Sequence, residues 1–178
     1  MIILCDQDDT LADYQGRILE IISAEYPELP TLAFDTLEHF YIERHYPLHL
    51  QDAVAQISQR KDFFRNLKPI PGGKEALEFL RASGHDVFIC TAPLLRYTHC
   101  VREKYEWIEE HFGDDWTDRM ILTRDKTLVH GDKLIDDKPV ITGVGIPKWE
   151  HIFYDRPYNR REPNRRLTWT NFKEVLGV

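Results

Sequence analysis

The sequence has few of the features that mark disulfide-rich, membrane-spanning or strongly basic proteins. Its three cysteines, Cys5, Cys90 and Cys100, are odd in number and show no Cys-x-x-Cys spacing. This argues against a disulfide framework or a zinc site and favours three packing residues. The first apolar run lasts five residues with no basic stretch before it, so neither a secretory signal nor a membrane span is expected. We expect a cytoplasmic protein without a membrane partner.

Positive net charge is also absent. The 178 residues carry a net charge of −7, which argues against a surface that grips a nucleic-acid polymer through its overall field. A small anionic substrate could still meet local cations. With 42% hydrophobic residues the chain can bury a core, and its length suits one compact domain or a domain with an insert.

Short apolar runs alternate with helical or loop segments along most of the chain, which is typical of an α/β fold with a largely parallel sheet. Between about 31 and 68 the pattern instead predicts short helices rich in aromatic residues and no strand. The turn-forming segment 69–73 predicts a boundary after them. The predicted strands are 1–5, 86–91, 120–122, 133–135 and 151–154.

Two further segments have a recognisable pattern. A long helix is predicted after strand 86–91, closed by Gly113, with an apolar stripe. Two arginine pairs, 160–161 and 165–166, are interrupted by proline and predict a solvated loop, with a phosphate or partner contact as the alternative. The predicted stripe consists of Tyr97, Cys100, Val101, Tyr105, Ile108 and Phe112.

Acidic and hydroxyl side chains follow three of the predicted strands. Asp6 and Asp8 end the first, Thr91 ends the second, and Asp136 with Asp137 ends a later one. Open α/β sheets bind ligands at the carboxyl ends of their strands, and carboxylates with a substrate phosphate are ligands that Mg²⁺ prefers. Taken singly, these residues also suit a helix cap, a turn and a satisfied strand end.

The same residues suggest a phosphoryl-transfer reaction. Asp6 could attack phosphorus to form an aspartyl-phosphate, while Asp8 protonates the leaving oxygen and later activates water. A phosphate beside several carboxylates also needs a cation. Lys126 and Lys133 are both candidates at this stage.

The order of these motifs, Asp6-x-Asp8-x-Thr10-Leu11, Thr91, a lysine and Asp136-Asp137, resembles that of the haloacid dehalogenase-like (HAD) phosphatases. The likeness is greater to one family among them, the 5'(3')-deoxyribonucleotidases, and it covers nearly the whole chain. The segments that carry it are 11–14, 88–93, 122–127, 134–139 and 149–151.

The resemblance implies a Rossmann-like HAD core, 1–14 and 69–178, with a small helical cap, 15–68, inserted after the first strand. It implies Asp6 as nucleophile, Asp8 as acid/base, and Mg²⁺ held by Asp6, the carbonyl of Asp8 and Asp137, with Asp136 adjoining. It selects Lys126 over Lys133, and it suggests a homodimer. The implied substrate-binding residues are Thr91, Ala92, Lys126, Tyr14, Phe40, Tyr41, Ile42 and Leu94.

The implied activity is Mg²⁺-dependent hydrolysis of (deoxy)ribonucleoside monophosphates. The alternatives are a HAD phosphatase for another small phosphomonoester, such as a sugar phosphate, and a metal- and phosphate-binding protein without turnover. Phe40 and Ile42 suit base contact or the packing of cap helices. The chain departs from the family pattern at Asp9, where glycine is usual, at Ser58, which replaces a tryptophan, and at Leu95, which replaces a lysine for which Arg96 could substitute.

Overall fold

The computed structural model describes residues 1–178 and contains a six-stranded, fully parallel sheet in the order β3-β2-β1-β4-β5-β6. The α/β, Rossmann-like expectation is thereby confirmed. No helix combines the length and apolar character needed to cross a bilayer. The strands are β1 Ile2–Cys5, β2 Asp86–Thr91, β3 Met120–Leu122, β4 Lys133–Asp136, β5 Glu150–Tyr154 and β6 Arg166–Leu167.

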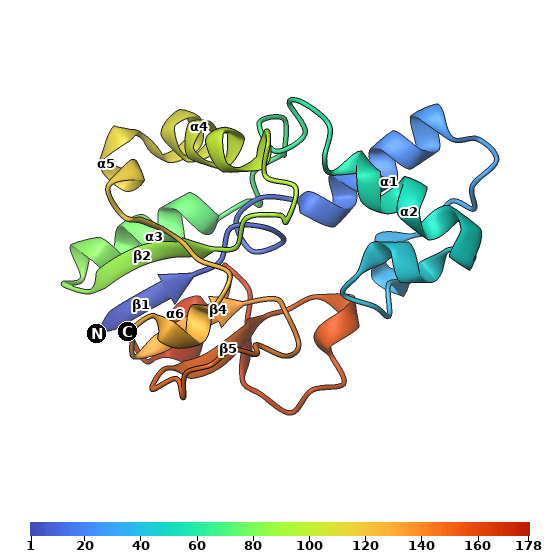
Figure 1. The fold of residues 1–178 in the computed structure, drawn as a ribbon. Helices are drawn as coiled ribbons and strands as arrows, with labels where there is room; N and C mark the ends of the chain where they lie inside the picture. Colours follow the sequence, from blue (N-terminus) through green and yellow to red (C-terminus); the bar gives the residue numbers. More distant parts are fainter.

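Continuous apolar runs form the central strands because both faces of the sheet are covered. Ile3 and Cys5 of β1 join a large core cluster that includes side chains of the helices α3, α4 and α6. Leu4, which points the other way, joins a smaller cluster with Leu134 and Trp149. Figure 1 shows α3 and α4 lying along one side of the sheet. These helices are α3 Gly73–Ala82, α4 Cys100–Phe112, the short α5 Asp114–Thr117 and α6 Phe172–Leu176.

Residues 14–67, called here the helical lobe, contain no strand and lie beyond the carboxyl ends of the strands (Figure 1). Asp13 begins the first helix by accepting a hydrogen bond from the Gly16 amide, and Pro27 follows soon after its end. The elements are α1 Tyr14–Glu25, the 3-10 helices η1 Phe34–Thr36 and η2 Ile42–His45, and α2 Leu48–Ile57. Two more 3-10 helices, η3 Lys126–Leu128 and η4 Pro157–Asn159, lie outside the lobe.

Two sequence expectations are wrong in part. Tyr97 and Tyr105 were expected in the apolar stripe of α4, but both are exposed. The buried face instead carries Lys104 and Trp107 together with Cys100, Ile108 and Phe112. Tyr97 precedes the helix, which begins at Cys100, and the buried face passes through Lys104 rather than Tyr105.

The expectation of a solvated loop is wrong for one of the four arginines. Arg166 lies on the short strand β6 and is partly buried. Its guanidinium donates to the carbonyls of Asn159 and Glu162 and pairs with Asp155 at 3.1 Å. A two-residue strand leaves too short a pattern for sequence periodicity to reveal. Arg160, Arg161 and Arg165 are exposed.

Candidate active site

The carboxyl ends of β1, β2 and β4 meet the helical lobe around one cavity of about 550 Å³. The order of the strands reverses at β1, and in open α/β sheets such a reversal is where ligands bind. Every residue expected at the site contributes to the wall of this cavity. They are Asp6, Asp8, Tyr14, Phe40, Tyr41, Ile42, Thr91, Ala92, Leu94, Lys126 and Asp137.

Three carboxylates converge at the end of the cavity nearest the sheet. Oxygens of Asp6, Asp136 and Asp137 all lie within 4.8 Å of one another. Lys126 Nζ lies 2.8 Å from Asp6 Oδ1 and 2.5 Å from Asp136 Oδ2. Burial by itself would lower the pKa of Lys126, but these carboxylates outweigh it and raise the pKa. A permanent cation therefore lies beside the acidic cluster.

The donor set fits a divalent cation that prefers oxygen ligands. Asp136 accepts hydrogen bonds from Lys126 and from the Lys138 amide, so both of its oxygens are already engaged. Asp137 accepts one from the Tyr158 hydroxyl at 2.5 Å. Burial and then the neighbouring Asp136, Asp9 and Asp6 raise the pKa of Asp137 well above its usual range. A bound cation would relieve this repulsion, and the free oxygens of Asp6 and Asp137 are available to it.

Asp8 is held by a lysine that the sequence patterns did not single out. Lys104 Nζ, on α4, lies 2.8 Å from Asp8 Oδ2 and 2.9 Å from Thr91 Oγ1, and its side chain is fully buried. Asp8 Oδ1 is buried without a partner. Burial raises the pKa of Asp8, and Lys104 opposes that rise. One oxygen of Asp8 is thus fixed by a cation while the other is free to exchange a proton.

Asp9 closes the tight turn that carries Asp6 and Asp8. Its φ of +51° lies in the left-handed region, where glycine is favoured and aspartate is tolerated. This accounts physically for the glycine that is usual at this position. The Asp9 carboxylate accepts a hydrogen bond from the Gln15 amide, and its carbonyl accepts one from Arg156 Nε at 2.7 Å. Burial raises the pKa of Asp9 to about 7.

The helical lobe contributes three aromatic side chains to the cavity wall, Tyr14, Phe40 and Tyr41, among aliphatic and polar ones. The Phe40 ring packs edge-on against Tyr41 and Tyr158, with centroids 5.0 and 5.8 Å away. Tyr14 packs against Phe63 and also faces the cavity. Ile42 is buried whereas Tyr41 is half exposed. This side of the cavity is suited to a flat apolar group.

Ser58 and Leu95, two of the positions at which the chain departs from the family pattern, both line the cavity but differ in exposure. Leu95 is exposed, and Ser58 is buried. Arg96 lies at the cavity and its guanidinium reaches Gln59 of the helical lobe at 3.4 Å. Arg96, the neighbour of Leu95, therefore brings a cation to the cavity wall.

The two candidate lysines have different partners and lie at opposite ends of the site strands. Lys126 lies among the carboxylates, whereas Lys133 begins β4, at the other end of that strand, and pairs with Glu150. The sequence argument missed Lys104, Gln15, Arg156 and Tyr158. Lys104 left a signal, because it stands four residues from both Cys100 and Ile108 on an apolar helix face. The other three left none: Arg156 and Tyr158 meet partners 147 and 21 residues away, and the Gln15 side chain meets the Phe40 carbonyl 25 residues away.

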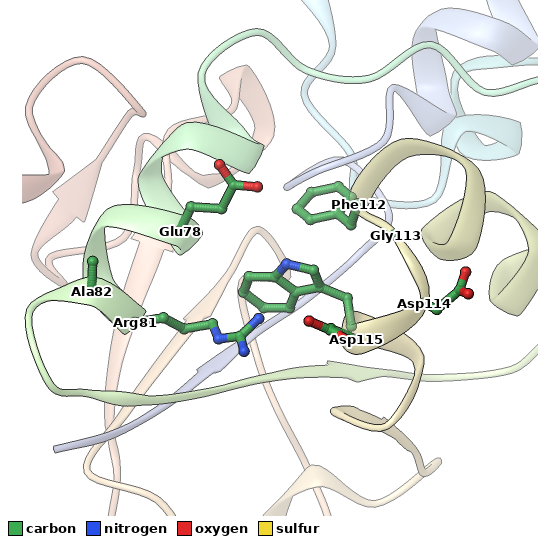
Figure 2. Close-up of a pocket in the computed structure, with 8 residues that line it drawn as sticks. Glu78, Arg81, Ala82, Phe112, Gly113, Asp114 and Asp115 are labelled. Carbon is green, nitrogen blue, oxygen red and sulfur yellow. The ribbon is translucent and has the colours of Figure 1, made fainter.

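A second hollow, of about 610 Å³, lies between α3 and the α4–α5 corner (Figure 2). Arg81 lies over the Trp116 ring there, 4.8 Å from its centroid. Its wall contains none of the residues expected at the site. The residues expected at the site line the cavity at the strand ends and not this hollow.

Comparison with known proteins agrees with this geometry. Residues 1–178 match the family model described as 5' nucleotidase, deoxy (pyrimidine), cytosolic type C protein. The chain is 47% identical to a Bordetella pertussis protein provisionally named as a 5'(3')-deoxyribonucleotidase, over 99% of this chain and 96% of that protein. It is 41% identical to the human cytosolic-type 5'(3')-deoxyribonucleotidase, over 98% and 92% respectively.

Solved structures show the same fold at much lower identity. A HAD family hydrolase from Deinococcus radiodurans, crystallised with phosphate and sodium, superposes with a TM-score of 0.60 at 16% identity. The match covers 99% of this chain and 94% of that one. The common element is the arrangement of strands and helices that surrounds the cavity.

Proposed function

Because the chain belongs to the 5'(3')-deoxyribonucleotidase family of HAD hydrolases, we propose that it hydrolyses (deoxy)ribonucleoside monophosphates to a nucleoside and inorganic phosphate. The observation that carries this proposal is the make-up of the cavity at the strand ends. Oxygens of Asp6, Asp136 and Asp137 lie within 4.8 Å of one another, with Lys126 Nζ 2.8 Å from Asp6 Oδ1. The helical lobe adds the aromatic side chains of Tyr14, Phe40 and Tyr41 to the same cavity. A nucleotide has a group to match each of these, a charged phosphate and a flat base.

In the first step, an Asp6 carboxylate oxygen attacks phosphorus, and the bond from phosphorus to the sugar oxygen breaks. Asp8 gives its proton to that leaving oxygen, which departs as the nucleoside alcohol. The unpartnered Asp8 Oδ1 supports this role, since the other oxygen is held by Lys104. Lys126 and Thr91 hold the phosphoryl oxygens.

In the second step, Asp8, now a carboxylate, takes a proton from water as the water oxygen attacks the aspartyl-phosphate. The bond from phosphorus to Asp6 breaks, which returns Asp6 as a carboxylate and releases phosphate. Asp8 ends the cycle protonated, as it began. The proton balance therefore needs no group beyond Asp8 and water.

Mg²⁺ is the proposed cofactor, held by Asp6, the carbonyl of Asp8 and Asp137, with Asp136 beside it. When bound, it neutralises charge on the phosphoryl group and so favours attack by a carboxylate. Lys126 adds a second, fixed positive charge on the side of Asp6 and Asp136. The fit rests on the close approach of the three carboxylates and the oxygen-only donor set.

We propose that residues 15–68, which make up most of the helical lobe, are the cap. Phe40, Tyr41 and Ile42 of the cap, with Tyr14 and Leu94 of the core, are the proposed contacts of the base and sugar; all five line the cavity. Stacking on aromatic side chains binds a base through its face and is tolerant of base identity. Gln15 supports this arrangement, because its Nε2 donates to the Phe40 carbonyl at 2.8 Å.

The test is hydrolysis of a panel of nucleoside monophosphates and sugar phosphates in the presence of Mg²⁺. We expect a much higher kcat/KM for the nucleotides, and we expect Asp6→Asn to abolish turnover, since an amide cannot replace the nucleophile. Preferred hydrolysis of a sugar phosphate would reject the substrate class and keep the chemistry. Binding without hydrolysis of any phosphomonoester would reject the enzymatic role.

A further inference from the structure

The segment 38–45 forms part of the cavity wall, and its last residue, His45, is hydrogen-bonded to its first two residues. Phe40, Tyr41, Ile42 and Glu43 from this segment face the cavity. The side chain of His45, the last residue of η2, contacts the backbone at the start of segment 38–45. His45 Nε2 accepts hydrogen bonds from the backbone amides of Glu38 and His39, at 2.9 and 3.3 Å.

These contacts determine the tautomer of His45. A backbone N–H can only donate, so Nε2 must be unprotonated to accept from both amides. The ring proton of the neutral form is then on Nδ1, which lies 3.1 Å from the Ile42 carbonyl and donates to it. A proton added to Nε2 would point at two donors and remove both hydrogen bonds.

We propose that neutral His45 is a positioning residue for the nucleotide: it closes the segment 38–45 and holds the aromatic wall in place, so that substrate binding weakens when His45 is protonated. This inference rests on the proposed function, which assigns the base and sugar to that wall. It concerns binding and leaves the reacting carboxylates untouched.

A second anchor explains why the effect should appear in binding. The side-chain Nε2 of Gln15 donates to the Phe40 carbonyl at 2.8 Å, and the backbone amide of Gln15 donates to the Asp9 carboxylate. The middle of the segment therefore stays attached to the turn that carries the catalytic aspartates. Release of the Glu38 and His39 amides loosens the start of the segment, directly before the cavity-lining Phe40 and Tyr41, and leaves Asp6 and Asp8 where they are.

The surroundings of His45 keep it neutral at neutral pH. Burial lowers its pKa, opposed by the hydrogen bond to the Ile42 carbonyl. His39, whose ring centroid lies 5.0 Å away, lowers the pKa further, while Glu38 and Glu43 raise it. Glu38 also pairs with Arg161 at 3.0 Å, and this nearby positive charge offsets part of the effect of Glu38 on the pKa of His45. The net effect is a pKa of His45 below the ordinary histidine value, so the ring is neutral at pH 7.5 and gains its proton on acidification.

The kinetic test compares wild type with His45→Gln, which keeps a neutral acceptor at every pH, between pH 7.5 and 5.5. Ionisation of substrate and of the catalytic carboxylates is common to both proteins and cancels in their KM ratio. We expect the ratio of wild-type KM to His45→Gln KM to rise by about three- to tenfold on acidification, the equivalent of one lost hydrogen bond. The control His49→Gln, an exposed histidine on α2, should leave the corresponding ratio flat.

At pH 7.5, His45→Ala should raise KM several-fold and keep kcat within about twofold of wild type, because only wall geometry is lost. A flat KM ratio for His45→Gln, or an equal loss of kcat in His45→Ala, would overturn the proposal. An unchanged kcat also shows that the variant has folded.

Ring nitrogen NMR of the wild-type protein gives a readout that does not depend on activity. We expect His45 to show a protonated Nδ1 and an unprotonated Nε2 at pH 7.5. The opposite tautomer, or a charged ring at that pH, would overturn the proposal even if nucleotides are hydrolysed. Conversely, the expected tautomer without nucleotide hydrolysis would mean that the proposed function had failed while the closure of segment 38–45 stood.

Discussion

At the scale of single residues, the site depends on buried groups whose role is set by one or two contacts. The fully buried Lys104 and the partly exposed Asp8 form a pair 2.8 Å apart, although they are 96 positions apart in the chain. Asp9 lies next to Asp8 in a backbone conformation that few side chains adopt. The chemistry of Asp8 therefore depends on a distant cation and on a strained neighbour.

We predict that Lys104→Met lowers kcat by about ten- to a hundredfold, because Asp8 and Thr91 both lose the group that orients them. Removing one partner of a buried pair should also cost about 3 kcal/mol in the free energy of unfolding. Steady-state kinetics and urea denaturation measure the two effects. Lys133→Met, at the far end of β4, is the matched control and should keep its kcat. A Lys104→Met enzyme with wild-type kcat would contradict the orienting role.

We predict that Asp9→Gly is more stable than Asp9→Ala by about 1 kcal/mol, because only alanine has a side chain that is strained at φ +51°. Both variants lose the same hydrogen bond to the Gln15 amide, so the difference isolates the backbone term. Chemical denaturation of the two variants side by side measures it. Equal stabilities would show that the turn relaxes out of the left-handed region.

At the scale of elements, the strands place charged groups at their ends and apolar or neutral groups between them. β5 is an instructive case, because its His151 ring lies among Trp149 and Phe153, with the Phe153 centroid 4.5 Å away. Nε2 of His151 is buried without a partner, and burial lowers the pKa to about 4. The strand therefore tolerates His151 only in its neutral form.

We predict that His151 makes the fold sensitive to acid. Its folded pKa of about 4 lies below the unfolded value of about 6.5, so the unfolded chain binds the proton first. Its contribution to stability is complete above about pH 6.5 and is lost as the pH falls toward 4, by about 2 kcal/mol after allowance for partial exposure.

Urea denaturation at pH 7 and pH 4.5 checks this expectation. His151→Phe should lose less stability than wild type on acidification, whereas His130→Phe, at an exposed position, should follow wild type. Identical pH dependence of wild type and His151→Phe would contradict the assignment.

At the scale of the whole molecule, the sheet holds three carboxylates so close together that they repel one another unless a cation lies between them. Oxygens of Asp6, Asp136 and Asp137 lie within 4.8 Å, and the neighbouring carboxylates raise the pKa of Asp137. Such an arrangement costs folding free energy unless something neutralises it. The parallel pairing of β1 with β4 fixes the positions of these acids, so the repulsion lowers the free energy of unfolding.

We predict that Mg²⁺ raises the Tm of the wild-type protein in a concentration-dependent way, because the ion binds the folded state alone. Asp137→Asn should abolish this rise, and its Tm without Mg²⁺ should equal or exceed that of wild type, since one buried charge is removed. Calorimetry with a chelator and then with added Mg²⁺ measures both. Asp118→Asn, at an exposed acid, should keep the wild-type response. A Tm for wild type that ignores Mg²⁺ would contradict the proposed metal site.

The local sequence predicted the elements that form the frame of the site. Short apolar runs such as 1–5 and 133–135, alternating with helical patterns, predict buried parallel strands, and the acids directly after these two runs are then expected at the carboxyl edge of the sheet. The expected site residues therefore border one cavity, because strand register follows from hydrophobic pattern alone.

Only the tertiary structure decided what each of those residues touches. The sequence left Lys104 on an apolar helix face, and the packing of α4 placed its ammonium group between Asp8 and Thr91. Tyr158 and Arg156 reach Asp137 and the Asp9 carbonyl from the far end of the chain. The physical reason is that periodicity reports which face of an element is buried, whereas the partner of a buried polar group depends on long-range packing.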